Sequence, residues 1–245
     1  MSLKHYAEFV EILAKYQISE RAQKVLDDLK LVLMIAPTAA GRNTIVRYQL
    51  KTGRYYYIVS DTTRPPRVND GVTEQNGQEC WFRSEETMLA DLKAGEFLEA
   101  ELIHGQQVSG ISIRELEKAR YAHKIAISDV DLGGIHKIVR AKPDTIAIML
   151  LPPGFEEWQR RLAGRGVMRP DEEKRRLETA RRIFEDGLKY DYYHFVISEN
   201  IEQSAAIIDA IVEGKPNPHQ GRGRSLIEHL QSALRDKLGT PGWHS

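Results

Sequence analysis

The chain has 245 residues, and its composition, 41% hydrophobic and 29% charged, is that of a folded globular protein and excludes a mostly disordered or collagen-like one. Its 35 basic residues balance 35 acidic ones, which excludes a protein-wide basic field for binding nucleic acid, so any basic site has to be local. The single cysteine, Cys80, excludes an intrachain disulfide framework and a cysteine-rich zinc site.

The sequence predicts a cytoplasmic protein without a membrane partner. Its longest apolar run, residues 145–153, is too short to span a bilayer. The first residues do not join a charged start to a long apolar core, as a signal peptide does. A reducing cytosol is therefore the expected compartment.

Residues 1–29 predict two amphipathic helices, an N-terminal helical extension. Apolar side chains recur there at helical spacing in two stripes, Tyr6, Phe9, Val10 and Leu13 in the first, and Ala22, Val25, Leu26 and Leu29 in the second. Ser19 is the expected N-cap of the second helix. Because such stripes usually face a core, we expect the extension to pack on the body of the protein, with docking to a partner as the alternative.

The length of the chain suits one α/β domain with appendages, and residues 30–214 carry the pattern of that domain. Short apolar runs alternate there with helical segments; the runs lie at residues 31–36, 55–60, 124–131, 145–151 and 195–198. Their length and their valine and isoleucine content suit buried strands. The helices between them suit right-handed crossovers in a parallel sheet.

Two stretches depart from this alternation. Residues 61–112 contain short alternating pieces and one capped helix at 84–94, which Gly95 ends, so we expect a small β-rich lobe inserted into the core. Residues 215–245 follow the domain and predict a linker, rich in proline and glycine over 215–223, and a C-terminal helix.

A candidate phosphate loop follows the first predicted strand. The segment Ala36-Pro-Thr-Ala-Ala-Gly-Arg-Asn-Thr44 leads from that strand into a helix, the placement in which backbone N–H groups converge on an anion. Against the usual G-x-x-x-x-G-K-[ST] pattern, Gly41 is kept, and Ala36, Arg42 and Asn43 differ. An ordinary strand-to-helix turn is the alternative interpretation.

A pair of arginines follows the second predicted strand, in Ser60-Asp-Thr-Thr-Arg64-Pro-Pro-Arg67. The prolines favour polyproline II geometry, in which three residues per turn place Arg64 and Arg67 on one side. Two guanidinium groups on one rigid face suit a phosphate, which each can bind through two hydrogen bonds. A solvated basic turn is the alternative.

Three carboxylates are further candidates. Glu99 alternates with Leu98 and Ala100, so it faces either a cleft or solvent, opposite a buried side. Asp129 and Asp131 share one face at the end of the third predicted strand, where α/β proteins place ligands and metals. A role in binding Mg²⁺ or sugar hydroxyls fits this position, and helix capping by Asp131 is the alternative.

Residues 160–182 predict an arginine-bearing lid. They carry nine basic side chains against four acidic ones, and Gly164-Arg-Gly166 supplies a mobile elbow between two helices. A solvated charged helix explains the same composition without a ligand.

Several motifs follow one another in a specific order. They are the 36–44 loop, Thr62-Thr-Arg-Pro-Pro-Arg67, Gly95-Glu-Phe-Leu-Glu99, Asp129-Val-Asp131, Leu151-Pro-Pro153, Arg161-Leu-Ala-Gly-Arg-Gly166 and Tyr190-Asp-Tyr192. In this order and spacing the chain resembles the guanylate kinase family over residues 31–214. The resemblance implies a P-loop NTPase core with a parallel sheet flanked by helices. A nucleotide-monophosphate lobe at 61–112 and a helical lid at 160–182 would complete a guanylate kinase-like domain over 30–214.

The resemblance further implies transfer of the γ-phosphoryl group of ATP to GMP, with Mg²⁺ as the metal cofactor. The ATP-binding residues would be Pro37, Thr38, Ala39, Ala40, Gly41, Arg42, Asn43 and Thr44. Arg42, Arg165 and Arg176 would act on the transferred phosphate, and Asn43, Thr44 and Asp129 would lie near the metal. The acceptor would be bound by Ser60, Arg64 and Arg67 through its phosphate, by Glu99 through guanine and by Asp131 through the nucleoside.

The chain departs from the family pattern in its phosphate loop and in the lobe at residues 61–112 that would bind the phosphate acceptor, the acceptor lobe. Arg42 stands in place of the family's lysine, and Ala39 in place of a glycine. Cys80 stands where an acceptor-binding tyrosine is expected, and Val108-Ser109-Gly110 replaces a Tyr-Tyr-Gly. Two alternatives to a GMP kinase therefore stay open: a weak or inactive domain that binds a nucleotide or a phosphorylated partner, and a kinase with another acceptor. The expected assembly is a monomer or a homodimer.

Overall fold

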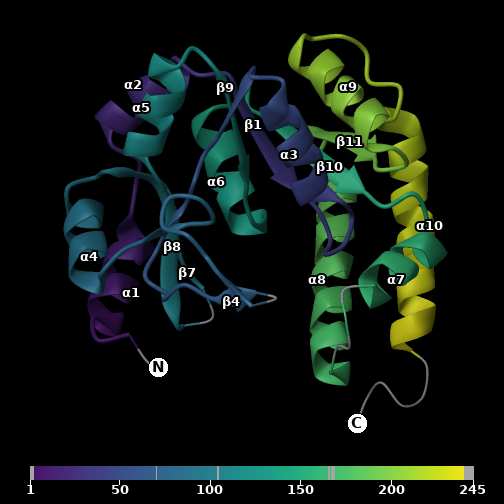
Figure 1. Cartoon of the computed structure of the whole chain (residues 1–245), viewed down its shortest axis with the longest axis horizontal. Helices are drawn as coiled ribbons and strands as arrows, with labels where there is room; N and C mark the ends of the chain where they lie inside the picture. The colour runs from purple at the N-terminus through teal and green to yellow at the C-terminus, as the bar shows by residue number, and fades with distance from the viewer. Residues whose placement is uncertain (1–2, 70, 104, 165, 167–168, 240–245) are drawn as a thin grey trace. The chain divides into compact units, whose positions relative to one another are not determined.

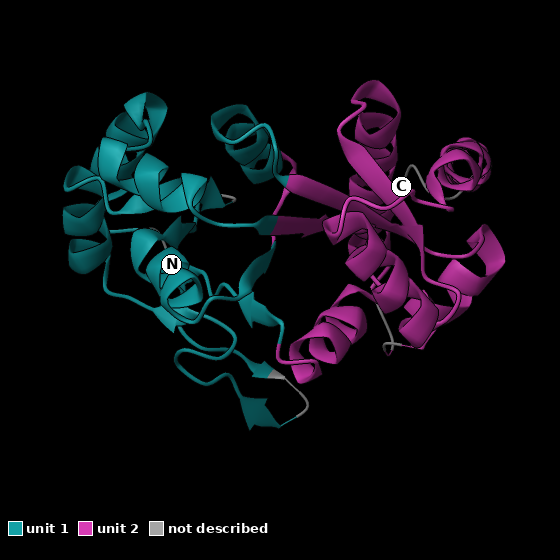
Figure 2. Ribbon diagram, turned by 90° about the horizontal axis from the view of Figure 1, so that it is seen from above, with its two compact units in different colours: residues 1–31, 54–128, 133–145 teal, residues 32–53, 129–132, 146–245 magenta. Residues whose placement is uncertain are grey.

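The computed structural model describes residues 3–69, 71–103, 105–164, 166 and 169–239. The chain divides into two compact units (Figure 2). Unit 1 comprises residues 1–31, 54–128 and 133–145, and unit 2 comprises residues 32–53, 129–132 and 146–245. Each unit contains both strands and helices.

The parallel strands of unit 2 form part of the core predicted for the main domain. β10 (Ile146–Leu151) pairs in parallel with both β1 (Leu31–Ile35) and β11 (Tyr193–Ile197). All five residues of β1 and five of the six in β10 are buried, as expected for strands that are covered on both faces. Near-continuous apolar runs in the sequence reflect this double burial.

Helices flank these strands. They are α3 (Arg42–Lys51), α7 (Phe155–Ala163), α8 (Pro170–Lys189), α9 (Ile201–Val212) and α10 (Gln220–Leu238). Within unit 2, α9 packs against α3, and α10 packs along α8 (Figure 1).

The C-terminal helix α10 begins at Gln220, inside the stretch 215–223 that the sequence predicts as a linker. The Asn217 amide donates to Phe195 O at 2.9 Å, and Ile197 N donates to His219 Nδ1 at 3.0 Å, so side chains of this stretch pair with the backbone of β11. A Cβ on Gly223 would overlap the Phe195 side chain, which shows how closely α10 approaches the strand. The C-terminal helix is thus part of the packed body of unit 2.

Unit 1 contains the β-rich lobe predicted for residues 61–112. Its four-stranded sheet has the order β6 (Trp81–Phe82), β3 (Asp61–Thr62), β8 (Gln107–Ser112), β7 (Phe97–Ile103). β7 and β3 both run antiparallel to β8, whereas β6 is parallel to β3. A separate antiparallel ribbon joins β4 (Val68–Asn69) to β5 (Val72–Thr73), and β2 (Tyr55–Tyr57) pairs in parallel with β9 (Ile125–Asp129).

The helices of unit 1 are α1 (Tyr6–Lys15), α2 (Glu20–Asp27), α4 (Glu85–Lys93), α5 (Ile113–Tyr121) and α6 (Leu132–Ala141). The expected N-caps Ser19 and Ser84 each accept a hydrogen bond from the backbone N–H three residues later. Both predicted N-terminal helices form, and α2 of the extension and α4 of the lobe begin at their expected caps.

The N-terminal extension packs on the lobe, as predicted, but the buried face of α1 differs from the predicted stripe. Phe9 is fully buried in a cluster with residues of α4 and β7, and Leu13 packs at its edge. Tyr6 and Val10 are instead 46% and 42% exposed. Ile12 takes part in the packing, so the apolar stripe of the sequence is rotated toward Phe9 and Ile12.

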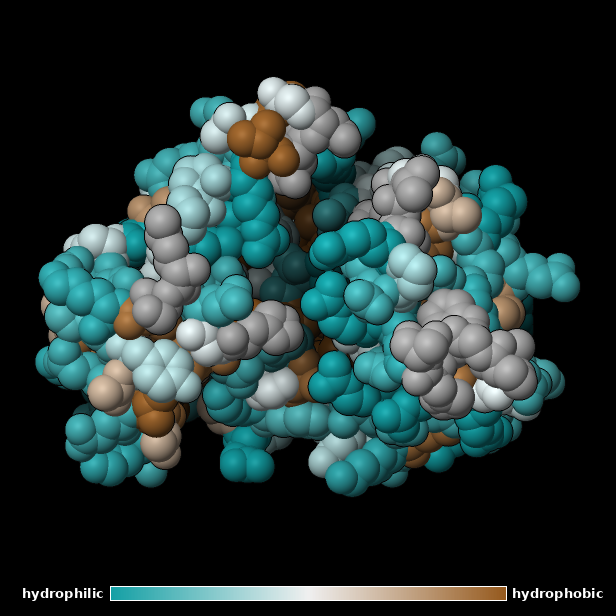
Figure 3. All heavy atoms as spheres, turned by 90° about the horizontal axis from the view of Figure 1, so that it is seen from below, coloured by the Kyte–Doolittle hydropathy of each residue, from teal (hydrophilic) through white to brown (hydrophobic). Residues whose placement is uncertain are grey.

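The surface agrees with the balanced composition. On the face drawn in Figure 3, hydrophilic side chains predominate among the described residues, and apolar side chains lie in small groups. Among the described residues, no helix has the length and hydrophobicity needed to cross a bilayer.

Candidate active site

The loop between β1 and α3 has the geometry predicted for a phosphate loop. Gly41 adopts a positive φ of 98° at the N-cap of α3, and Ala39 adopts a positive φ of 67°. The N–H groups of Thr44 and Ile45 both donate to Gly41 O at 3.1 Å, which closes the first helical turn. Residues 36–44 line a cavity of about 160 Å³ at this helix N-terminus, the arrangement that favours an anion.

Residues of α7 and of the segment after β11 hold this loop in place. The buried Trp158 indole donates to Thr38 O at 2.7 Å. Arg161 donates to the Ser198 hydroxyl at 3.0 Å and to Ser198 O at 3.1 Å. Gly41 and Arg161 share a second cavity, of about 460 Å³, which also includes residues 198–201. Trp158 and Ser198 were not identified as site residues from the sequence, because only the fold brings them to the loop.

The residue in place of the family's lysine, Arg42, forms an ion pair with Asp129. Its Nη2 lies 2.6 Å from Asp129 Oδ2, and each side chain is 28% exposed. Asn43 and Thr44 lie with exposed side chains in the same first turn of α3. The structure therefore brings three residues of the predicted ATP and metal site together with Arg42, all within unit 2. Asp131 is exposed and directly precedes α6.

The predicted lid consists of the end of α7 and the start of α8. Arg176 donates to Glu172 Oε1 at 2.5 Å on α8, and its Nη1 is buried without a hydrogen-bond partner among the described residues. An unpartnered guanidinium N–H is a donor for which an anion would be a suitable acceptor. Arg165, the other predicted lid residue, lies outside the described residues.

In unit 1, the Arg64 guanidinium is held by Glu74. Nη1 donates to Glu74 Oε2 at 2.5 Å and Nη2 to Oε1 at 3.0 Å, a two-pronged pair whose side chains are 13% and 9% exposed. The same carboxylate accepts a hydrogen bond from Arg67 N at 2.8 Å. The hydrogen bond from Arg64 lowers the pKa of Glu74 below its ordinary value, so the carboxyl group stays ionised beside the guanidinium.

The side chain of Arg64 and the backbone N–H of Arg67 thus both donate to the Glu74 carboxylate. The Arg67 side chain is exposed, and Arg64 additionally lies over the Phe82 ring, with 5.4 Å from its Cζ to the ring centroid. Ser60 directly precedes β3 and accepts a hydrogen bond from Trp81 N at 2.9 Å. Sequence reasoning did not identify Glu74; the available signal was an acidic residue close after two arginines in an otherwise polar segment.

Glu99 lies on β7, next to an irregularity in the strand. From Phe97 to Glu99 the strand advances two residues while its partner β8 advances one, from Ser112 to Ile111. Such a bulge shifts the alternation of side chains, so Phe97 and Ala100 share the core face. Glu99 lies on the other face and is 9% exposed. The sequence alternatives for Glu99 were a cleft or solvent, and its low exposure excludes open solvent; its role in base recognition stays a prediction.

Two buried carboxylates of unit 1 have no place in the predicted site. Asp61 accepts a hydrogen bond from Arg114 at 2.7 Å, and burial raises its pKa. Glu115 accepts hydrogen bonds from the Trp81 indole at 3.0 Å and from Lys118 at 2.7 Å. Because both carboxylates join strands and helices of the lobe, they stabilise the scaffold that carries Arg64.

No cluster of three or more His, Cys, Asp or Glu side chains that could hold a metal ion occurs in the described part of the chain. This does not conflict with the predicted magnesium site. In nucleotide sites Mg²⁺ takes one or two protein ligands and completes its shell with phosphate oxygens and water.

The chain is similar to known proteins over most of its length. The family model described as guanylate kinase matches residues 28–215. The chain is 35% identical over 188 residues to the guanylate kinase of Corynebacterium diphtheriae, covering 76% of this chain and 95% of that protein. It is 31% identical over 210 residues to the guanylate kinase of Symbiobacterium thermophilum, covering 84% and 96%.

A solved structure supports the fold alone. The guanylate kinase of Anaplasma phagocytophilum superposes with a TM-score of 0.55 at 24% identity, covering 83% of this chain and 94% of that one. The fold is that of an α/β P-loop NTPase, as the loop between β1 and α3 indicated. With the family model matching most of its length, this chain belongs to the guanylate kinase family.

Proposed function

We propose that this chain transfers the γ-phosphoryl group of ATP to GMP. The bond between the γ-phosphorus and the oxygen that bridges it to the β-phosphate breaks, and a bond from a GMP phosphate oxygen to the γ-phosphorus forms, giving ADP and GDP. The observation that carries the proposal is the family match over residues 28–215. Its chemical support is the loop and cavity between β1 and α3 in one unit and, in the other, Arg64 held by Glu74 with little exposure to solvent. Phosphoryl transfer needs mainly positioning and charge neutralisation.

On the donor side, the loop of residues 37–44 binds the ATP phosphates. Backbone N–H groups around the cavity of about 160 Å³ supply donors, and Arg42 supplies a positive charge beside them. Arg165 and Arg176 contact the transferred phosphoryl group, where Nη1 of Arg176 gains the acceptor that it lacks in the described residues. The lid that carries them excludes water, which would otherwise hydrolyse ATP.

On the acceptor side, Ser60, Arg64 and Arg67 bind the phosphate of GMP. Glu99 recognises guanine, because the guanine edge presents two adjacent N–H donors that match the two oxygens of a carboxylate, whereas adenine presents one donor beside an acceptor. Asp131 contacts the nucleoside. A carboxylate at position 99 therefore favours GMP over AMP.

The residues around the loop fit a magnesium ion that is bound mainly by ATP phosphates. Thr44 offers a hydroxyl in the first turn of α3, Asn43 offers an amide oxygen beside it, and Asp129 offers a carboxylate held close to the loop by Arg42. When bound, the ion neutralises charge on the β- and γ-phosphates. These oxygens are the hard ligands that Mg²⁺ prefers.

The proposal is tested by measuring ADP release from ATP and Mg²⁺ with GMP, dGMP, AMP, UMP or CMP, and with no acceptor. GMP-dependent turnover is the expected result. Turnover with another acceptor only would refute GMP as substrate and direct attention to Cys80 and residues 108–110. GMP binding by calorimetry without turnover would instead make the chain a nucleotide-recognition domain.

A further inference from the structure

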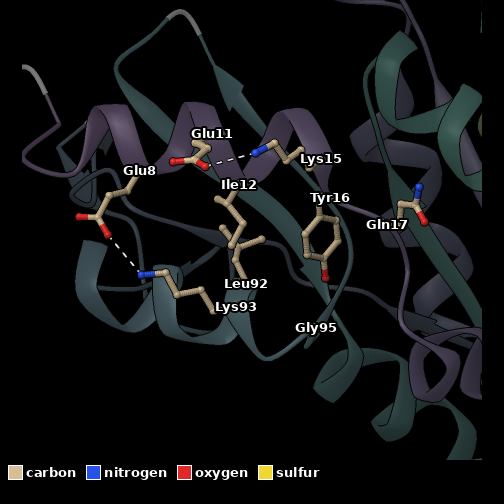
Figure 4. A pocket seen from close by; sticks show the side chains of 9 residues that line it. All are labelled: Glu8, Glu11, Ile12, Lys15, Tyr16, Gln17, Leu92, Lys93 and Gly95. Atoms are coloured by element: carbon tan, nitrogen blue, oxygen red, sulfur yellow. Dashed lines mark hydrogen bonds and ion pairs between the residues drawn. The ribbon is translucent and has the colours of Figure 1, made fainter.

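The N-terminal extension packs against the acceptor lobe. It lies almost wholly before residues 28–215, the segment that matches the family model. Phe9 is buried among Met88 and Leu92 of α4 and Phe97 of β7. Ion pairs also join the two: Glu8 contacts Lys93 at 3.2 Å and Arg21 contacts Glu96 at 2.6 Å, among others. Figure 4 shows the contact surface between α1 and α4, which we call the seam, with Glu8 of α1 and Lys93 of α4 facing each other across it.

Tyr16, the residue that follows α1, makes the most specific contact in this seam. Its hydroxyl donates to Phe97 O at 2.7 Å and accepts from Phe97 N at 3.0 Å. In Figure 4 the hydroxyl points away from α1 toward the end of α4 at Gly95. Because β7 is an edge strand of its sheet, one phenol oxygen serves both backbone groups of Phe97 in place of a neighbouring strand.

The contact of Tyr16 with Phe97 lies at the bulge of β7. This bulge determines the face of the strand on which Glu99 lies. Phe97 and Ala100 face the cluster that holds Phe9, and the extra residue between Phe97 and Glu99 turns Glu99 to the opposite face. Glu101 lies on that opposite face too, since Lys137 of α6 donates to it at 2.8 Å. A slip of one residue would reverse every side chain and direct Glu99 into the apolar cluster.

We propose that Tyr16 is a positioning residue for acceptor recognition: its hydroxyl fixes the backbone of Phe97 at the bulge and thereby holds Glu99 on the face that binds guanine. This inference rests on the proposed function, in which Glu99 reads the base. It gives the N-terminal extension a part in nucleotide selection, although that segment lies outside the region that defines the family.

The electrostatic surroundings of Tyr16 suit this role. Burial, together with the nearby carboxylates of Glu96 and Glu99, raises the pKa of the hydroxyl above its ordinary value, against the smaller opposite effect of its hydrogen bond to Phe97. The phenol therefore stays protonated and keeps both its donor and its acceptor function.

The test compares Tyr16→Phe with wild type and with two control variants. Tyr6→Phe removes the hydroxyl of an exposed tyrosine in the first turn of α1, the helix that Tyr16 follows. Ser19→Ala removes a helix cap and a hydrogen bond of 2.9 Å to Gly95 O, so it destabilises the same seam without touching Phe97. For each protein we measure KM for GMP and for ATP, kcat, the ratio of GMP to AMP turnover, and amide hydrogen exchange over residues 96–103.

Loss of both bonds to Phe97 should raise the KM for GMP about tenfold in Tyr16→Phe and lower the GMP-to-AMP ratio, with the KM for ATP unchanged. Exchange over residues 96–103 should become faster in the same variant, and the controls should keep the KM for GMP of the wild type. An equal rise in Ser19→Ala, or no rise in Tyr16→Phe beside normal wild-type turnover, would refute the positioning role alone. Wild-type protein that neither binds nor phosphorylates GMP would refute the proposed function, and this inference with it.

Discussion

The replacement of the family's lysine by Arg42 leads to the most direct prediction about catalysis. In the structure, Arg42 lies at the first turn of α3 and pairs with Asp129 at 2.6 Å. If its guanidinium contacts ATP phosphates during transfer, Arg42→Ala removes a charge-assisted hydrogen bond, which contributes about 1.5–3 kcal/mol. Each 1.36 kcal/mol corresponds to about a tenfold change in rate, so kcat should fall by about 10- to 150-fold.

The same structure predicts that Arg42 variants stay folded. Both side chains of the pair are 28% exposed, and an ion pair that accessible to water contributes at most about 1 kcal/mol to the free energy of unfolding. Thermal melts of Arg42→Ala and Arg42→Lys should therefore lie within a few degrees of wild type. A loss of turnover can then be assigned to the site and not to unfolding.

Arg42→Lys separates charge from shape. A lysine keeps the positive charge and restores the ammonium that a phosphate loop usually carries, so kcat should remain within about tenfold of wild type. Steady-state ADP release with saturating GMP measures both variants. Unchanged kcat in Arg42→Ala would refute the assignment of Arg42 to the phosphates. A fall in Arg42→Lys as large as in Arg42→Ala would show that the loop depends on the arginine's planar shape.

Two further predictions concern the acceptor lobe. Arg64→Ala should raise the KM for GMP at least about tenfold and leave the KM for ATP unchanged, because a charge-assisted contact to the acceptor phosphate is lost; equal changes in both constants would remove that assignment. Since Arg64 lowers the pKa of Glu74, the pair stabilises the fold fully above the ordinary glutamate pKa of about 4.3 and loses this effect as pH falls through the lowered value. Denaturant titrations of wild type and Glu74→Gln should accordingly converge as the pH falls through the lowered pKa of Glu74, and a difference in stability that stays constant from neutral pH through the whole acid range would contradict this.

The parts of the fold that depend on local pattern could be predicted from the sequence. Buried parallel strands such as β1 and β10 consist of continuous apolar residues, and the strand–loop–helix order around Gly41 indicates a phosphate loop whatever residues replace the usual ones. The N-caps Ser19 and Ser84 follow equally from local chemistry.

Contacts between residues far apart in the chain could not be predicted in this way. Nothing near Tyr16 in the sequence points to Phe97, 81 residues later, and nothing near Thr38 points to Trp158, 120 residues later. The stripe on α1 was only partly correct for a related reason. Phe9 and Leu13 pack on the lobe as expected, but Tyr6 and Val10, which also have the spacing of core residues, are exposed, and Ile12 packs in their place.

Three of the arginines assigned to phosphate binding share a feature that bears on how this protein selects its substrates. Arg42 is paired with Asp129, Arg64 with Glu74 and Arg176 with Glu172, each within its own unit. In the described part of the chain, each of these three guanidinium groups therefore already has a carboxylate partner.

A phosphate must therefore compete with a carboxylate at short range, where the number and direction of hydrogen bonds decide the outcome. A phosphate group offers three oxygens and up to two negative charges, against the two oxygens and single charge of a carboxylate. Selection then depends on how accurately each binding group is held in place. Glu74 holds the guanidinium of Arg64, and Tyr16 holds the strand that carries Glu99.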